Sequence, residues 1–264
     1  MNKLICPLCS LSLIPNEQGL TCTNRHQFDR AKEGYFNLLP VHHKGSREPG
    51  DGKLQLSARR AFLSAGFFSP LLTELKNLVN PNVRSLLDIG CGEGYFTRGL
   101  GEHCQQADIY GIDISKIGMR FASKIDKRAT YAVASSYQLP FADASIDVIV
   151  RIYAPSKDSE LMRVVSSGGR LVIVTPGERH LMSLRKKIYE EIRPHPKPKA
   201  PEGFVEVAQS SVSFALDLPP GEAACALLDM TPFAWKLKSE NMSELKMGGI
   251  KDLADFQIGV YEVA

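Results

Sequence analysis

The chain lacks the features that would place it in or across a membrane. No run of eighteen apolar residues occurs among its 264 residues, and a spanning helix needs about twenty. The first ten residues, MNKLICPLCS, also lack the apolar stretch of a secretion signal. We therefore expect a cytoplasmic protein with no membrane partner, whose cysteines stay reduced.

A strong overall charge is also missing, because the net charge is only +3. The hydrophobic fraction of 44% suffices for a full core, but the length is short for two large domains. Residues 1–60 nevertheless hold nine Lys and Arg against five Asp and Glu. This basic excess is consistent with an RNA contact, although a merely solvated surface explains it equally well.

Four residues of the kind that bind zinc lie near the amino terminus. Cys6, Cys9, Cys22 and His26 form a C-x2-C-x12-C-x3-H array, a spacing that suits tetrahedral zinc. Disulfides or unpaired structural cysteines are the alternatives, but three thiols cannot all pair among themselves. Because four protein ligands leave no position for a catalytic water, we expect a structural Zn²⁺ ion.

A glycine-rich loop follows a predicted strand at residues 85–89. Gly90, Gly92 and Gly94 are spaced G-x-G-x-G, and Asp88 precedes them. Glycines permit turn dihedrals that other residues avoid and let the backbone come close to a ligand. The loop therefore predicts a cofactor site at the end of this strand.

The residues around the loop distinguish two kinds of cofactor. Asp88 would repel the pyrophosphate of a dinucleotide, yet it could hold the ammonium group of an amino-acid cofactor. The third glycine also falls one residue early for the dinucleotide-binding fingerprint. Asp113 ends the next apolar strand, so its carboxylate could accept the ribose hydroxyls of an adenosine group. The pattern resembles motif I of class I S-adenosylmethionine (SAM) methyltransferases.

Predicted strands continue beyond this motif. A strand ends at Ser135, and strands at 145–152 and 167–176 follow. Many class I relatives have an acidic residue that contacts adenine at the position of Ser135. Segments 205–218 and 255–263 are expected to form a terminal antiparallel pair. The predicted fold is α/β: a Rossmann-like class I methyltransferase with a mostly parallel seven-stranded sheet, plus a small amino-terminal zinc-binding module.

Helical patterns flank this core. Residues 54–79 read as two helices broken near Gly66 that cover the cofactor, and 178–193 as one helix with His180 near its start. The predicted division is a zinc-binding module at 1–40, a linker with cofactor-lid helices at 41–82, and a SAM methyltransferase domain at 83–264.

Two missing motifs reduce the range of possible methyl acceptors. No Pro-Cys or Thr-Cys dipeptide follows the cofactor motifs, which argues against carbon methylation through a cysteine nucleophile. The segment after the fourth strand reads RIYAP at 151–155 instead of Asn/Asp-Pro-Pro-Tyr/Phe, which grips an exocyclic amine. A ring nitrogen, an oxygen or a small-molecule acceptor remains.

Taken together, these motifs resemble one family, the bacterial 23S rRNA guanine-N1 methyltransferases of the RlmA type. The similarity covers nearly the whole chain and includes CPLC, RHQFD, AKEGYFNLLP, ARRAFL, LDIGCGEGY, RIYAP, TPGERHLM and LLDMTPFAW. It implies methyl transfer from SAM to N1 of one guanine in a 23S rRNA hairpin, presented as RNA or as a large-subunit precursor. It also implies RNA recognition by the zinc module and a homodimer.

The resemblance also implies ligand residues, while the catalytic residue stays unassigned. Zinc falls on the Cys6, Cys9, Cys22 and His26 array. The SAM contacts carried over by position, together with those of the general motif, are Phe68, Asp88, Gly90, Gly92, Glu93, Gly94, Asp113, Ser135 and His180. Phe68 replaces a Tyr that is frequent in relatives, so stacking would survive but a hydroxyl hydrogen bond would not.

Two other functions remain open from the sequence. A small-molecule methyltransferase, of the kind used in ubiquinone biosynthesis, would share the cofactor motifs, but it would not need the zinc array. A zinc-dependent RNA-binding protein without catalysis would not need Asp88, the three glycines and Asp113.

Overall fold

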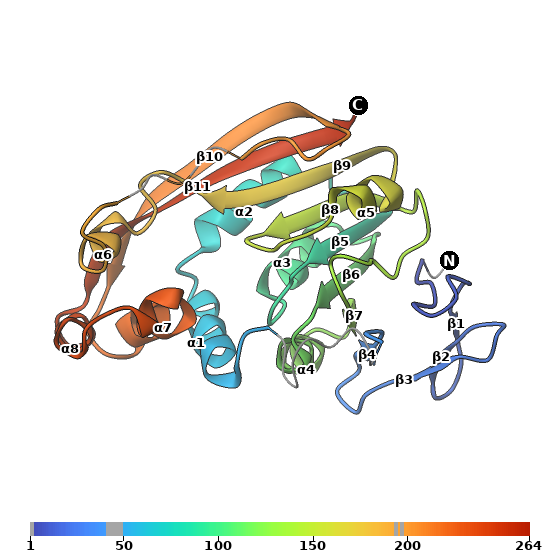
Figure 1. The fold of residues 1–264 in the computed structure, drawn as a ribbon, viewed down its shortest axis with the longest axis horizontal. Helices are drawn as coiled ribbons and strands as arrows, with labels where there is room; N and C mark the ends of the chain where they lie inside the picture. The colour runs from blue at the N-terminus through green and yellow to red at the C-terminus, as the bar shows by residue number, and fades with distance from the viewer. Residues whose placement is uncertain (1–2, 41–49, 193–194, 196–197) are drawn as a thin grey trace.

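The computed structural model describes residues 3–40, 50–192, 195 and 198–264 and confirms the predicted fold class (Figure 1). The main sheet has the strand order β10-β11-β9-β8-β5-β6-β7-β4. Its strands are β4 (Phe36–Asn37), β5 (Ser85–Ile89), β6 (Asp108–Asp113), β7 (Thr130–Val133), β8 (Ile146–Ile152), β9 (Val165–Pro176), β10 (Phe204–Leu218) and β11 (Ile250–Val263).

The main sheet combines a parallel centre with an antiparallel end. The central strands β5, β6, β7, β8 and β9 pair with one another in parallel, and β5 is buried along its whole length, as expected for a parallel strand covered on both faces. Strand β11 runs antiparallel to both β9 and β10. The predicted terminal antiparallel pair is thus present, and it forms one edge of the sheet in Figure 1.

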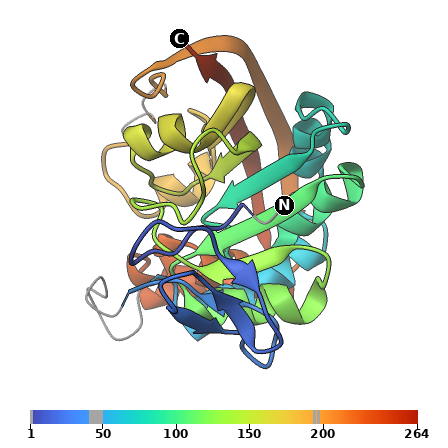
Figure 2. The same cartoon turned by 90° about the vertical axis from the view of Figure 1, so that its right-hand side faces the viewer.

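An eighth strand, which the sequence does not predict, joins the opposite edge. Strand β4 closes the amino-terminal module and pairs in parallel with β7. The module also contains a small antiparallel sheet of β1 (Ile14–Pro15), β2 (Gly19–Thr21) and β3 (Gln27–Asp29). Figure 2 shows this blue module lying against the main domain.

The module shares a hydrophobic core with the main sheet. Leu13 and Leu20 are buried in the same cluster as Leu87 and Ile112 of β5 and β6. The N–H of Ile5 also donates to the carbonyl of Pro140 at 3.0 Å. The amino-terminal module is therefore packed against the main sheet and does not stand apart from it.

Helices cover the main sheet. They are α1 (Lys53–Ser64), α2 (Ser69–Leu78), α3 (Tyr95–His103), α4 (Lys116–Ile125), α5 (Asp158–Val164), α6 (Met182–Lys186), α7 (Glu222–Met230), the 3₁₀ helix η2 (Pro232–Trp235) and α8 (Ser239–Gly248). Helices α2, α3 and α7 bury apolar residues in the larger core cluster, while α5 contributes to the core on the zinc module's side.

Two local predictions meet different outcomes. The break between α1 and α2 falls at Gly66, which has φ of +83°, as predicted. The long helix predicted at 178–193 is wrong, because among the described residues of this segment only Met182–Lys186 is α-helical. Residues 41–49, the first part of the predicted linker region at 41–82, lie outside the described residues. Among the helices that the structure describes, none has the length and apolarity to cross a bilayer.

Candidate active site and zinc centre

A large cavity opens where the parallel strands end. Its volume is about 1040 Å³, and residues that follow β5, β6, β7 and β8 contribute to its wall. In open α/β sheets, ligands bind beyond the carboxyl ends of the parallel strands, where this cavity lies. Eight of the nine predicted SAM contacts line the cavity: Phe68, Asp88, Gly90, Gly92, Glu93, Asp113, Ser135 and His180.

Gly94 is the predicted contact that the structure leaves off this wall. It precedes α3 with φ of +85°. A Cβ there would lie 2.8 Å from the Cβ of Ala122 and 2.9 Å from the hydroxyl of Tyr131. The glycine therefore allows α3 to pack against α4 and β7.

Asp88 is a buried carboxyl at the end of β5. It is only 2% exposed, and the hydroxyl of Thr97 in α3 donates to it at 2.6 Å. Burial raises the pKa of Asp88 to about 7, while the hydrogen bond from Thr97 opposes the shift. A cationic ligand would stabilise the ionised form of this carboxyl.

Two further carboxyls adjoin it. Burial raises the pKa of Glu93 to about 7, although the charges of Arg59 and Arg98 lower it. Burial also raises the pKa of Asp113, against hydrogen bonds from the amides of Ser115 and Gly92. This end of the cavity is therefore acidic and suits a ligand with positive charge.

The loop amides are used within the protein. Those of Gly90 and Cys91 donate to the carbonyl of Ile112 at 2.8 and 3.0 Å, and that of Gly92 donates to Asp113 at 2.9 Å. The glycines thus allow close approach rather than supplying free donors to a ligand. Burial holds the pKa of the Cys91 thiol well above its usual value, which disfavours the thiolate that a nucleophilic cysteine requires.

The segment around α1 covers the glycine loop. Arg59 forms an ion pair with Asp51 at 2.5 Å, and both residues line the cavity. A guanidinium nitrogen of Arg59 lies 3.5 Å from where a Cβ on Gly92 would be. The pairing of Arg59 with Asp51 depends on the folded position of α1.

Aromatic residues form another wall. Phe68 makes edge contacts with Phe62 and Phe256 at ring-centroid distances of 5.0 Å, so it is a core residue as well as a cavity residue. Phe67, by contrast, packs against the core without lining the cavity.

Ser135 accepts a hydrogen bond from the amide of Tyr137 at 3.1 Å, which leaves its hydroxyl proton for a ligand.

His180 is held as a neutral donor. The N–H of Asp255 donates to its Nδ1 at 3.1 Å, so we assign the ring proton to Nε2. Burial lowers the pKa of His180 to about 4. At neutral pH this side chain can donate a hydrogen bond but does not act as a cation, and its available nitrogen is not a base.

The sequence motifs only partly reveal the other residues of the cavity wall. Tyr153 lines the cavity, but Arg151 does not and instead donates to the hydroxyl of Ser156 at 2.6 Å. Tyr189 and Phe233 come from the segments after α6 and α7. No local pattern marks Tyr189 as a cavity residue, because the folding of the carboxyl-terminal third brings it there.

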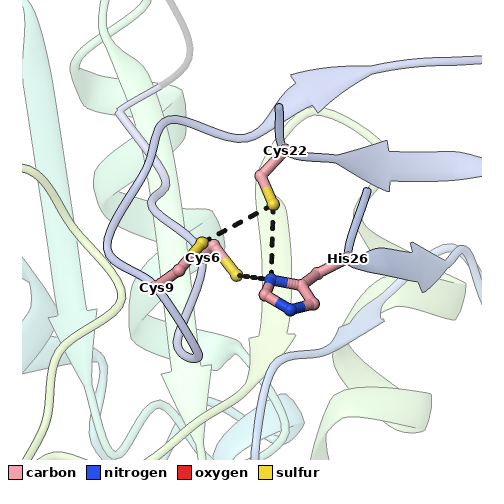
Figure 3. Close-up of side chains that lie close together, drawn as sticks. All are labelled: Cys6, Cys9, Cys22 and His26. Atoms are coloured by element: carbon pink, nitrogen blue, oxygen red, sulfur yellow. Dashed lines mark hydrogen bonds between the residues drawn. The ribbon is translucent and has the colours of Figure 1, made fainter. Parts of the chain in front are cut away.

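The zinc array converges as predicted (Figure 3). The four ligand atoms of Cys6, Cys9, Cys22 and His26 all lie within 4.8 Å of one another. The sulfurs of Cys9 and Cys22 are 3.7 Å apart, and Nδ1 of His26 is 3.4 Å from the sulfur of Cys6 and 3.5 Å from that of Cys22.

The three separations of 3.4, 3.5 and 3.7 Å fit zinc geometry. Zn–S bonds of about 2.3 Å and Zn–N bonds of about 2.0 Å in a tetrahedron give edges of about 3.8 Å between sulfurs and about 3.5 Å between sulfur and nitrogen. The donor set and its spacing therefore suit one tetrahedral Zn²⁺ ion. All four positions are filled by protein atoms, which is typical of a structural site.

The strand order, the glycine loop and the cavity define a class I SAM-dependent methyltransferase that carries a zinc ribbon. Sequence profiles agree: residues 4–47 match the RlmA N-terminal zinc ribbon, and residues 87–173 match a methyltransferase domain. The YcgJ protein of Bacillus subtilis is a solved structure with 15% identity and a TM-score of 0.46, covering 73% of this chain and 97% of its own.

Curated relatives extend the similarity over almost the full length. YxjB of Bacillus subtilis (strain 168), which carries the name of a 23S rRNA (guanine-N1)-methyltransferase, is 33% identical over 97% of this chain and 96% of its own. The 23S rRNA (guanine(748)-N(1))-methyltransferase of Streptomyces fradiae is 29% identical over 88% of this chain and 85% of its own. The chain belongs to the RlmA family of 23S rRNA (guanine-N1)-methyltransferases.

Proposed function

We propose that this enzyme transfers a methyl group from SAM to N1 of a guanine in a hairpin of 23S rRNA. The observation that carries the proposal is the similarity to rRNA methyltransferases over both modules, zinc ribbon and catalytic domain. A small-molecule methyltransferase would need only the second module.

The acidic end of the cavity is the proposed SAM site. SAM supplies a methyl group already activated on a sulfonium. Asp88, Glu93 and Asp113 would hold its positive groups and its ribose hydroxyls, and their burial supports this role. Gly90, Gly92 and Ser135 would contact the rest of the cofactor from the same wall, whereas Gly94 shapes the loop.

His180 and Phe68 complete the proposed site. As a neutral Nε2–H donor, His180 would hydrogen-bond the cofactor carboxylate or an oxygen of the acceptor. Phe68 would give an apolar contact, fixed by its core neighbours. Because transfer from an activated donor depends mainly on alignment, rigid walls of this kind contribute through positioning.

The acceptor chemistry constrains the remaining groups. Guanine N1 carries a proton that must leave before or during transfer. His180 has a lowered pKa and an occupied Nδ1, and a tyrosine hydroxyl such as that of Tyr153 has an ordinary pKa of about 10 and keeps its proton at pH 7. Neither side chain accepts this proton at neutral pH, so the catalytic base remains unassigned.

The zinc module has two proposed roles. Its shared core and the β4–β7 pairing support a structural role for the ion in holding the module on the sheet. Its basic residues, among them Arg25, Arg30 and Lys32, would contact rRNA phosphates. The division into 1–40, 41–82 and 83–264, the homodimer and the cytoplasmic location remain predictions.

The test is methylation of unmodified 23S rRNA transcript with tritiated SAM, followed by reverse transcription. A methyl group on N1 blocks the pairing edge, so a single stop at a hairpin guanine is expected. The Asp113→Asn variant serves as the matched control, and it should lose the stop because its amide is a poorer acceptor for the ribose. Label incorporated without a stop would contradict the proposed position, and label in small molecules alone would favour the alternative acceptor.

A further inference from the structure

A tyrosine after β8 combines backbone strain with exposure to the cavity. Tyr153 has φ of +55°, a left-handed conformation that a bulky residue adopts only when its surroundings enforce it. It lines the cavity and yet is 49% exposed. Packing in the core alone does not explain an aromatic residue that is held at a conformational cost and left half open.

The loop that carries Tyr153 is fixed at three points. The amide of Tyr153 donates to a carbonyl of β9 at 3.3 Å, and Arg151 donates to the hydroxyl of Ser156 across the loop at 2.6 Å. Ala154 comes so close to Gly90 that a Cβ on that glycine would collide with the alanine methyl group. The contact between Ala154 and Gly90 places the loop that carries Tyr153 directly against the glycine loop.

Neighbouring rings set the position of the side chain. The Tyr153 ring centroid lies 6.2 Å from those of both His180 and Phe256, and the latter two rings are 4.9 Å apart. Two aromatic neighbours thus adjoin the tyrosine while about half of it remains open. These contacts form within the protein without a ligand, and a side chain positioned in advance lowers the entropy cost of binding a flat group there.

Four other aromatic residues are less well placed. Tyr137 lines the cavity and is 57% exposed, but among the described residues no ring contact fixes its position. Trp235 is 84% exposed but is not part of the cavity wall. Phe233 does line the cavity, but it also packs against the larger core cluster. Tyr189 is engaged at its hydroxyl and ring by Lys236. Tyr153 combines an open ring with a fixed link to the glycine loop.

We propose that Tyr153 is the platform on which the target base stacks after it leaves the RNA helix and enters the cavity. The inference rests on the proposed function, because it requires an RNA substrate. A base extruded from its helix loses its stacking partners, and a protein ring restores part of that interaction. Ring stacking needs the aromatic face and not the hydroxyl.

Three substitutions separate these contributions. Tyr153→Phe keeps the ring, Tyr153→Leu keeps apolar bulk without an aromatic face, and Tyr153→Ala removes both. Each variant is assayed for kcat/KM with unmodified 23S rRNA transcript, for SAM affinity by calorimetry, and for its thermal midpoint. Substitution of a stacking residue typically weakens binding of a base about 5- to 150-fold.

We expect Tyr153→Phe to keep kcat/KM within about twofold, and the Leu and Ala variants to lose it within this 5- to 150-fold range. SAM affinity and the thermal midpoint should stay near wild-type values. Full kcat/KM in the Leu variant would overturn the proposal, as would a parallel loss of SAM affinity. If the wild-type enzyme methylates a site other than guanine N1, the proposed function is refuted instead. The ratios of kcat/KM between the variants and the wild type would still decide whether the base stacks on Tyr153.

Discussion

SAM binding should release protons, because two carboxyls in the proposed cofactor site have pKa values near neutrality before the ligand arrives. Burial raises the pKa of both Asp88 and Glu93 to about 7. A cationic ligand favours their ionised forms and lowers these pKa values. Binding and ionisation are therefore linked, and affinity should rise with pH until the carboxyls are already ionised.

The size of the effect follows from the pKa. A group with a pKa of about 7 is almost fully protonated at pH 5.5 and half protonated at pH 7.0. If the ligand requires the ionised form, affinity for SAM should increase about 16-fold between these two values for one carboxyl, and more if both titrate. The α-amino group of SAM, with an ordinary pKa of about 8, stays mostly charged over this range.

Isothermal titration calorimetry in buffers of different ionisation enthalpy measures both quantities. At pH 5.5 we expect about one proton released for each participating carboxyl. The Glu93→Gln variant keeps the side-chain shape without titrating, so its pH dependence should fall toward that of one carboxyl. Affinity that stays constant from pH 5.5 to 7.0 with no proton release would refute the linkage between these carboxyls and SAM.

Three further results are expected. A chelator that removes zinc should lower the thermal midpoint of the catalytic domain, because the module shares its core and β4 pairs with β7; an unchanged calorimetric transition would show that the two parts are independent. Gly94→Ala should destabilise the fold by about 1–3 kcal/mol in urea unfolding, more than the control Gly168→Ala, which has φ of +71° but open space around it. The ¹⁵N resonances of the His180 ring should titrate near pH 4, and a midpoint near 6.5 would contradict its buried, neutral state.

Local sequence patterns predict the parts of this fold that depend on local chemistry. The zinc array is recognisable because its ligands are few, chemically distinctive and regularly spaced. The order of strands around the glycine loop is recognisable because buried parallel strands give short apolar runs. Asp88 and Asp113 follow from their positions at the ends of such strands.

Features set by distant contacts are not predictable in this way. Strand β4 is only Phe36–Asn37, and its pairing with β7 joins residues almost a hundred positions apart. The helix predicted at 178–193 stops at Lys186, and Tyr189 beyond it contacts Lys236 in the carboxyl-terminal third. Asp252 of β11 accepts hydrogen bonds from the first turn of this helix. Tertiary contacts therefore decide where this segment is helical.

The most direct test of the central claim is the chemical identity of the methylated nucleoside. Unmodified 23S rRNA transcript is incubated with the purified enzyme and SAM carrying a deuterated methyl group, digested to nucleosides and analysed by mass spectrometry against standards. The account predicts that the label elutes with 1-methylguanosine. Label in N2-methylguanosine, in a ribose-methylated nucleoside or in no nucleoside would contradict it.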